Sequence, residues 1–168
     1  MLHLFDLDHT LVHSLTVPLP GHDSFRIIVN GNTYFVHVRP HVVDFLKILH
    51  EQKVPWGIWT AGTEDYMNEV VSGLFLMAKI PLRAKELKVC LTRKHTTHVN
   101  NTYVKDLSYF GKIDVILYDD DMVHKNWPKN KGRIVRVPPY DVTKKGCNRD
   151  CFFLTLRCEK NATMLSVR

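Results

Sequence analysis

The chain has 168 residues, of which 45% are hydrophobic and 24% are charged, and we expect residues 1–168 to form one folded domain. No apolar run is long enough to span a membrane, and an expected strand begins at Leu2, so we expect an intracellular protein without a signal peptide. The formal net charge of +6 favours anionic partners such as phosphoproteins or nucleic acids.

Apolar strands alternate with amphipathic helices along the chain. The expected strands span residues 2–7, 25–38, 54–61, 113–121 and 133–137. The second of these carries Asn30-Gly31, a strong signal for the turn of a β-hairpin. Four helices are expected. The first begins at Pro40, and the second runs from Glu64 to about Ala78 with Thr63 as its N-cap. The third is a short helix within 104–110, and the fourth runs from Asn148 to about Cys158. The polar segment 85–102 predicts no particular element.

This alternation predicts an α/β fold, a Rossmann-like parallel sheet flanked by helices on both faces. The hairpin at 25–38 is a small insertion in that fold. The intervals between the polar strand ends leave no room for a large cap domain.

Three apolar strands end in polar residues. The first ends in Asp6 and Asp8, the second in Thr60, and the third in the acids 119–121. In open α/β sheets ligands bind beyond the carboxyl ends of the strands, so we expect these residues to converge. Clustered carboxylates repel one another unless a cation lies among them, and oxygen ligands suit Mg²⁺. The pattern predicts a Mg²⁺ site that meets a phosphate.

Four ordered motifs resemble those of a known family. "DLDHT" resembles the first motif of haloacid dehalogenase superfamily phosphatases of the DxDx[TV] type. The longer stretches "DLDHTLVHS", "RPHVVDFL", "WTAGTEDY", "LTRKH", "NTYVKDLS" and "VILYDDD" are similar to the phosphatases that act on the C-terminal tail of RNA polymerase II, the FCP/SCP-like or NLI-interacting-factor-like family. These stretches carry four motifs in the right order and spacing, which is a specific signal.

The resemblance implies a role for each catalytic residue. Asp6 would be the nucleophile that becomes an aspartyl phosphate. Asp8 would be the general acid for the leaving oxygen and then the base for the hydrolytic water. Thr60 would donate its hydroxyl to a phosphoryl oxygen, and Lys105 would offset the charge of the nucleophile and the phosphoryl group.

The resemblance also implies the residues around that centre. Mg²⁺ would be held by Asp6, by the main-chain carbonyl of Asp8, and by Asp119 and Asp120, directly or through water. The residues assigned to substrate binding are Thr10, which would steady the loop of Asp8, and also Ala61 and Arg93. An ordinary exposed arginine is an equally good interpretation of Arg93.

Several residues depart from the family pattern or are left open by it. His9 stands where the family usually has glutamate, and "YDDD" replaces "LDN", so either Asp119 or Asp120 could be the direct metal ligand. The other histidines show no metal-binding spacing, and we predict most of them to lie on the surface. Cys147, Cys151 and Cys158 would share one face of the last expected helix, as a zinc site or, as we favour, as thiols packed in a reducing compartment.

The leading interpretation is a Mg²⁺-dependent phosphatase for phosphoserine or phosphothreonine in proteins, with the RNA polymerase II tail as the implied substrate class. A 3′-phosphatase for nucleic-acid ends is a second interpretation, and a non-catalytic phosphoprotein-binding module is a third. The basic segment 125–136 could attract an anionic substrate or could be a solvated surface, and the sequence favours neither.

Overall fold

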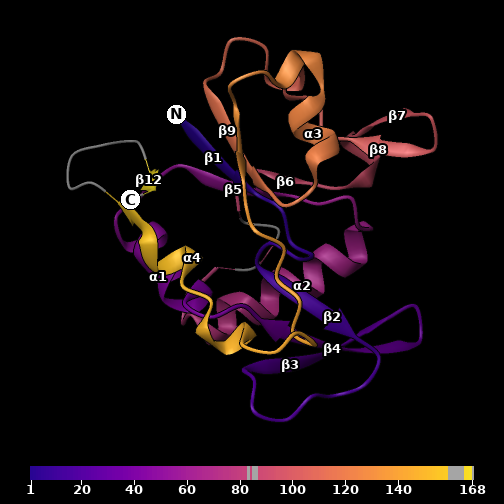
Figure 1. Ribbon diagram of the computed structural model, residues 1–168, viewed down its shortest axis with the longest axis vertical. Helices are drawn as coiled ribbons and strands as arrows, with labels where there is room; N and C mark the ends of the chain where they lie inside the picture. Colours follow the sequence, from indigo (N-terminus) through magenta and orange to yellow (C-terminus); the bar gives the residue numbers. More distant parts are fainter. Residues whose placement is uncertain (83, 85–86, 159–164, 168) are drawn as a thin grey trace.

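The computed structural model describes residues 1–82, 84, 87–158 and 165–167. Within these residues, the centre of the fold is a five-stranded parallel sheet with the strand order β10-β9-β1-β5-β6 (Figure 1). Its strands are β1 (Leu2–Phe5), β5 (Trp56–Trp59), β6 (Cys90–Leu91), β9 (Val115–Asp119) and β10 (Ile134–Arg136). The parallel sheet with flanking helices confirms the predicted fold class.

The remaining strands form small antiparallel units. The chain leaves β1 through a three-stranded sheet of β2 (Val12–Leu15), β3 (Ser24–Val29) and β4 (Asn32–Val38). Asn30 and Gly31 join β3 to β4 with positive φ angles of 50° and 77°, as the predicted hairpin turn requires. Two further pairs are β7 (Thr97–Val99) with β8 (Thr102–Val104), and β11 (Leu156–Cys158) with β12 (Leu165–Val167).

The helices are α1 (Val42–Glu51), α2 (Glu64–Met77), α3 (Met122–Asn126) and α4 (Phe152–Thr155), and 3-10 turns are η2 (Arg93–His95), η3 (Leu107–Phe110), η4 (Pro128–Asn130) and η5 (Cys147–Arg149). The Thr63 side chain accepts a hydrogen bond from the backbone N–H of Tyr66, which confirms it as the N-cap of α2. The short helix predicted within 104–110 is the 3-10 turn η3. No helix in the described part of the chain is both long and apolar enough to cross a membrane.

Successive side chains of the central strands pack on opposite faces of the sheet. Phe5, Ile58 and Tyr118 face the main core, to which α1, α2 and α4 contribute. Leu4 and Trp59 face a smaller core closed by residues of η3. Both faces of the sheet are therefore covered, and its polar strand ends are left to form a site.

The predicted helix from Asn148 to about Cys158 is wrong. Only Phe152–Thr155 is α-helical, and Leu156 already begins β11, which pairs with β12. Phe152 and Phe153 are neighbours in sequence, yet both rings lie near the buried guanidinium of Arg39, at 5.3 and 5.5 Å. The three cysteines therefore do not share a helix face, and the side chain of Cys158 lies outside the described residues.

Candidate active site

A cavity of about 340 Å³ lies at the carboxyl ends of β1, β5 and β9. The side chains predicted to converge there do so, because Asp6 directly follows β1, Thr60 directly follows β5, and Asp119 ends β9. The cavity is lined by Asp6, Asp8, His9, Thr60, Ala61, Gly62, Arg93, Lys105, Asp119, Asp120, Asp121 and His124. Of the predicted site residues, Thr10 alone does not line it.

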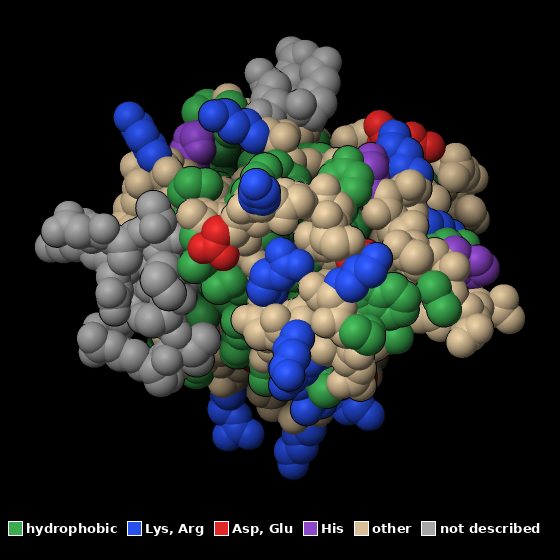
Figure 2. Space-filling view, turned by 90° about the horizontal axis from the view of Figure 1, so that it is seen from above, with side chains coloured by type: hydrophobic (Ala, Val, Ile, Leu, Met, Phe, Trp, Pro, Cys, Tyr) green, Lys and Arg blue, Asp and Glu red, His purple; other side chains and the backbone are tan. Residues whose placement is uncertain are grey.

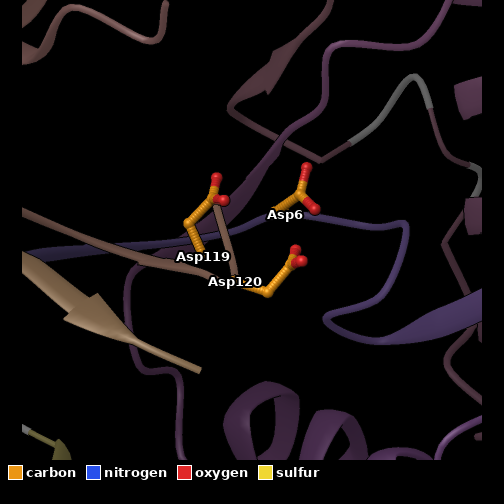
Figure 3. Close-up of side chains that lie close together, drawn as sticks. All are labelled: Asp6, Asp119 and Asp120. Carbon is orange, nitrogen blue, oxygen red and sulfur yellow. The ribbon is translucent and has the colours of Figure 1, made fainter. Parts of the chain in front are cut away.

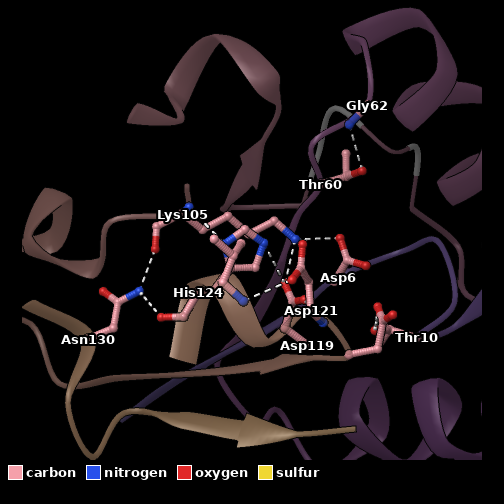
Figure 4. A network of polar contacts seen from close by, with 11 residues as sticks. Asp6, Thr10, Thr60, Gly62, Lys105, Asp119, Asp121, His124 and Asn130 are labelled. Carbon is pink, nitrogen blue, oxygen red and sulfur yellow. Dashed lines mark hydrogen bonds and ion pairs between the residues drawn. The ribbon is translucent and has the colours of Figure 1, made fainter. Parts of the chain in front are cut away.

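Lys105 lies between two of the acids. Its ammonium group donates to Asp6 Oδ1 at 2.5 Å and to Asp119 Oδ2 at 2.7 Å (Figure 4). Lys105 and Asp119 are both only 1% exposed. Burial alone would lower the pKa of Lys105, but the charges of Asp119 and Asp6 outweigh it and raise that pKa, so the lysine stays protonated.

Two residues that the sequence did not reveal hold the backbone of Lys105. His124 Nδ1, on α3, accepts a hydrogen bond from the Lys105 N–H at 3.2 Å. Asn130 Nδ2 donates to the carbonyl oxygens of Lys105 and His124, and its Oδ1 accepts from the N–H of Leu107. Both side chains are buried, and His3 and His37 are buried as well, whereas the other seven histidines are exposed or partly exposed, which agrees with the prediction for most of them.

Three carboxylates lie close enough together to hold a metal ion. Asp6, Asp119 and Asp120 each offer one oxygen, and these atoms lie within 4.8 Å of one another (Figure 3). Burial and the charge of Asp119 raise the pKa of Asp120, and burial raises that of Asp6 despite the opposing charge of Lys105. Among the described residues, no other three His, Cys, Asp or Glu side chains come together in this way.

Thr10 and Asp121 border this group without being part of it. The Thr10 hydroxyl donates to Asp120 Oδ1 at 3.3 Å, so it orients an acid and does not face the cavity. Asp121 Oδ1 accepts a hydrogen bond from the N–H of Val123 and caps α3. The third acid of "YDDD" thus has a structural partner of its own.

The remaining predicted residues lie at the rim of the cavity. The N–H of Gly62 donates to Thr60 Oγ1 at 2.9 Å, which leaves the hydroxyl proton of Thr60 free for another acceptor. Arg93 Nε donates to the carbonyl oxygen of Ala61 at 2.7 Å, and its guanidinium lies 4.9 Å from the ring centre of Tyr103. These contacts fix the side chain of Arg93 at the cavity although it is exposed.

The loop after β1 is fastened to the C-terminal part of the chain. His9 Nδ1 donates to the carbonyl oxygen of Tyr140 at 3.0 Å, and the His9 carbonyl accepts from the Tyr140 N–H at 2.6 Å. Arg39 is buried, donates to the carbonyl oxygen of Thr10 and forms an ion pair with Asp150 at 2.7 Å. A glutamate at position 9 could not donate to the Tyr140 carbonyl, so this contact depends on the histidine that departs from the family pattern.

The family model for NLI interacting factor-like phosphatases matches residues 2–161. The chain belongs to this family. It is 34% identical over 113 residues to CTD small phosphatase-like protein 2 of Dictyostelium discoideum, and 31% identical over 112 residues to CTD small phosphatase-like protein 3 of Caenorhabditis elegans. Each match covers 65% of this chain, but only 18% and 37% of the relatives. The chain therefore spans less than half the length of either relative.

Two solved structures share the fold. One is a variant of the fission yeast RNA polymerase II CTD phosphatase Fcp1 bound to beryllium fluoride, with a TM-score of 0.59 and 22% identity. The other is described as Fcp1, an essential RNA polymerase II CTD phosphatase, with a TM-score of 0.60 and 23% identity. The matches cover 83% of this chain and 41% and 42% of the Fcp1 chains.

Proposed function

We propose that the chain is a Mg²⁺-dependent phosphatase that acts through an aspartyl phosphate and removes phosphate from phosphoserine or phosphothreonine in a protein. The observation that carries this proposal is the meeting of Asp6, Asp8 and Lys105 in one cavity with the acids at the end of β9. A nucleophilic carboxylate, a second carboxylate for proton transfer and positive charge are the parts that this chemistry needs.

In the proposed reaction, a carboxylate oxygen of Asp6 attacks phosphorus, and the bond from phosphorus to the leaving oxygen breaks. Asp8 gives its proton to that oxygen, then takes a proton from the water that hydrolyses the aspartyl phosphate. Lys105, 2.5 Å from Asp6, offsets negative charge on the phosphoryl oxygens. Thr60 donates its free hydroxyl proton to one of those oxygens, and Arg93 binds the substrate at the rim.

The residues present fit Mg²⁺. The three carboxylates of Asp6, Asp119 and Asp120 are oxygen ligands of the kind that Mg²⁺ prefers, and the family resemblance adds the main-chain carbonyl of Asp8, which would keep the ligand set all-oxygen. Lys105 pairs with Asp6 and Asp119, and no ion pair within the described residues includes Asp120, so a further cation would relieve the repulsion among the three acids. When bound, Mg²⁺ supplies positive charge that offsets the negative charge of the transferring phosphoryl group.

Access to the cavity and membership of the family support the proposed substrate class. Within the described residues, no separate domain covers the cavity, so a phosphate presented on a macromolecule has access to it. The relatives named as CTD phosphatases support a phosphorylated protein, with the RNA polymerase II tail as one candidate. A binding module without catalysis is disfavoured, because Asp6, Asp8 and Lys105 are all present and juxtaposed.

Hydrolysis of p-nitrophenyl phosphate by the purified chain tests the chemistry. We expect turnover with Mg²⁺, loss of turnover with EDTA, and recovery when Mg²⁺ is restored. Asp6→Asn should be inactive, while Asp114→Asn, which neutralises an exposed acid, should retain activity. An inactive native chain across mildly acid to neutral pH would refute the enzyme assignment, and activity that persists in EDTA would refute the metal assignment.

A second comparison tests the substrate class. We expect a higher kcat/KM for a phosphoserine or phosphothreonine peptide than for a 3′-phosphorylated oligonucleotide of similar charge. The opposite order would favour the nucleic-acid 3′-phosphatase and overturn the proposed substrate class without affecting the assigned chemistry.

A further inference from the structure

A second side chain is hydrogen-bonded to the residue assigned as general acid. The hydroxyl of Tyr66, in the first turn of α2, donates to Asp8 Oδ1 at 2.5 Å. Ser14 Oγ, on β2, lies 2.6 Å from the same hydroxyl oxygen. A tyrosine hydroxyl has one proton, and Tyr66 gives it to Asp8, so Ser14 must be the donor to Tyr66. The direction of the chain is therefore Ser14 to Tyr66 to Asp8.

Both donors are held by their own elements. The backbone N–H of Tyr66 donates to the N-cap Thr63, and the ring packs edge-on against Tyr34 with 6.4 Å between centroids. Ser14 is paired in register with Val36 in the three-stranded sheet. The hydroxyl groups are thus delivered by two elements that are separate from the loop of Asp8.

The hydroxyls of Ser14 and Tyr66 belong to a second cavity beside the catalytic one. Asp8 lines the catalytic cavity and also a neighbouring cavity of about 350 Å³, to which Ser14, Tyr34 and Tyr66 belong. Tyr66 and Ser14 do not line the catalytic cavity. Their hydroxyls therefore reach Asp8 from the neighbouring cavity.

We propose that Tyr66, supported by Ser14, is a positioning residue that fixes which oxygen of Asp8 transfers the proton; this inference rests on the proposed function. Oδ1 is occupied by the Tyr66 hydroxyl, so the proton of the acid is carried on Oδ2. As the bond from phosphorus to the leaving oxygen breaks, the Oδ2 proton moves to that oxygen and the product alcohol forms. Asp8 is left as a carboxylate, and the attacking water returns a proton to Oδ2.

The dependence on the leaving group tests this role. A serine or threonine alkoxide leaves only when it is protonated, whereas p-nitrophenolate leaves without much help from an acid. The ratio kcat/KM covers the steps up to leaving-group departure and excludes hydrolysis of the aspartyl phosphate. We expect Tyr66→Phe to lower kcat/KM about tenfold for a phosphoserine peptide and less than about twofold for p-nitrophenyl phosphate.

Matched variants complete the experiment. Tyr34→Phe removes a phenol hydroxyl from the same neighbouring cavity without a contact to Asp8, and it should leave the ratio of the two kcat/KM values unchanged. Ser14→Ala should shift that ratio in the same direction as Tyr66→Phe but less, and Ser14→Thr should restore it. Circular dichroism and the urea midpoint report whether each variant is folded.

Equal losses with both substrates in a folded Tyr66→Phe variant, or no loss with either, would overturn the positioning role. A native chain that hydrolyses neither substrate would instead refute the proposed function. The two failures are therefore distinguishable.

Discussion

Lys105 makes its two ion pairs with acids to which different tasks are assigned. Asp6 is the proposed nucleophile, and Asp119 belongs to the proposed metal site. One buried ammonium thus orients both carboxylates, and its backbone is fixed by His124 and Asn130. Because four hydrogen-bonded side chains hold one lysine in place, little rearrangement is needed when a phosphoryl group arrives.

The role of the Thr60 hydroxyl can be tested with a matched pair of substitutions. Its Oγ1 already accepts from the Gly62 N–H, so the hydroxyl proton is the part that remains for the substrate. We expect Thr60→Val to lower kcat/KM for p-nitrophenyl phosphate by roughly 10²–10³, the usual cost of one lost donor, and Thr60→Ser to stay within a few-fold of the native value. A Thr60→Val variant as active as Thr60→Ser would contradict the assigned role.

The residues that could be predicted from sequence are those at strand ends. Asp6 and Thr60 directly follow apolar strands, and parallel strands place their ends at one edge. Tyr66 and Asn130 could not be found this way, because each is hydrogen-bonded to a site residue that is distant in the sequence and lies on another element. Folding alone brings these side chains into contact with their polar partners.

The close packing of α2 on β3 predicts the effect of a substitution on stability. A Cβ atom at Gly73 would lie 2.1 Å from the ring of Phe25. Alanine gains about 1 kcal/mol of helix propensity over glycine, but overpacking of this kind costs about 1–3 kcal/mol. We expect Gly73→Ala to lower the free energy of unfolding by about 1 kcal/mol in urea, and the exposed control Ser72→Ala not to lower it. A Gly73→Ala variant more stable than the native chain would contradict this packing.

The contact of β2 with the C-terminal part of the chain makes stability depend on pH. His13 Nδ1 accepts from the N–H of Val142 at 3.1 Å, and burial together with the neighbouring His9 lowers the pKa of His13. The folded chain then binds this proton less readily than the unfolded chain, so the stability contribution is complete above the ordinary histidine pKa near ~6.5 and is lost as the pH falls through the lowered value.

Urea denaturation at several pH values measures this effect. We expect the native midpoint to fall between about pH 6.5 and pH 5, and the midpoint of His13→Asn to fall less, because asparagine can accept the same hydrogen bond without titrating. Burial also lowers the pKa of His124, so part of the dependence should remain in the variant. Identical pH profiles would show that His13 does not contribute.

Elements with strong local signals were predictable, and those fixed by tertiary contacts were not. Asn30-Gly31 and the cap Thr63 encode their turn and helix locally. The last expected helix does not form over its full length. Phe152 and Phe153 both pack near the guanidinium of Arg39, a tertiary contact that helical periodicity does not predict. The two-residue strand β6 was missed because its pairing with β5 defines it more than its own sequence does.

One face of the molecule carries a group of positively charged side chains (Figure 2). Figure 2 looks down on the α3 end of Figure 1 and shows several Lys and Arg side chains with few acids between them. Lys112, Lys125, Lys131, Arg133 and Arg136 make no ion pair with a described acid. Two of these cations are close to the site in the fold, since Arg136 is in register with Asp119, and Lys125 belongs to α3, which directly follows the cavity-lining Asp121.

Charge reversal tests whether this face attracts substrate. We expect the Lys125→Glu and Lys131→Glu double variant to lower kcat/KM for a multiply phosphorylated peptide several-fold at low salt, with a smaller effect at high salt. Turnover of p-nitrophenyl phosphate should not change. The double variant Lys47→Glu and Lys53→Glu, with the same change of net charge at α1, is the control. Equal effects of the two double variants would mean that net charge alone is responsible.

Asp6 is proposed to carry the phosphoryl group during turnover. To test this role, the chain is quenched in acid during turnover of excess phosphopeptide with Mg²⁺ and reduced with borohydride, and its peptides are sequenced by mass spectrometry. Borohydride converts an aspartyl phosphate to homoserine, so we expect homoserine at position 6 in the native chain and none in Asp6→Asn. Sustained turnover with an unmodified Asp6, or with the modification at another residue, would contradict it.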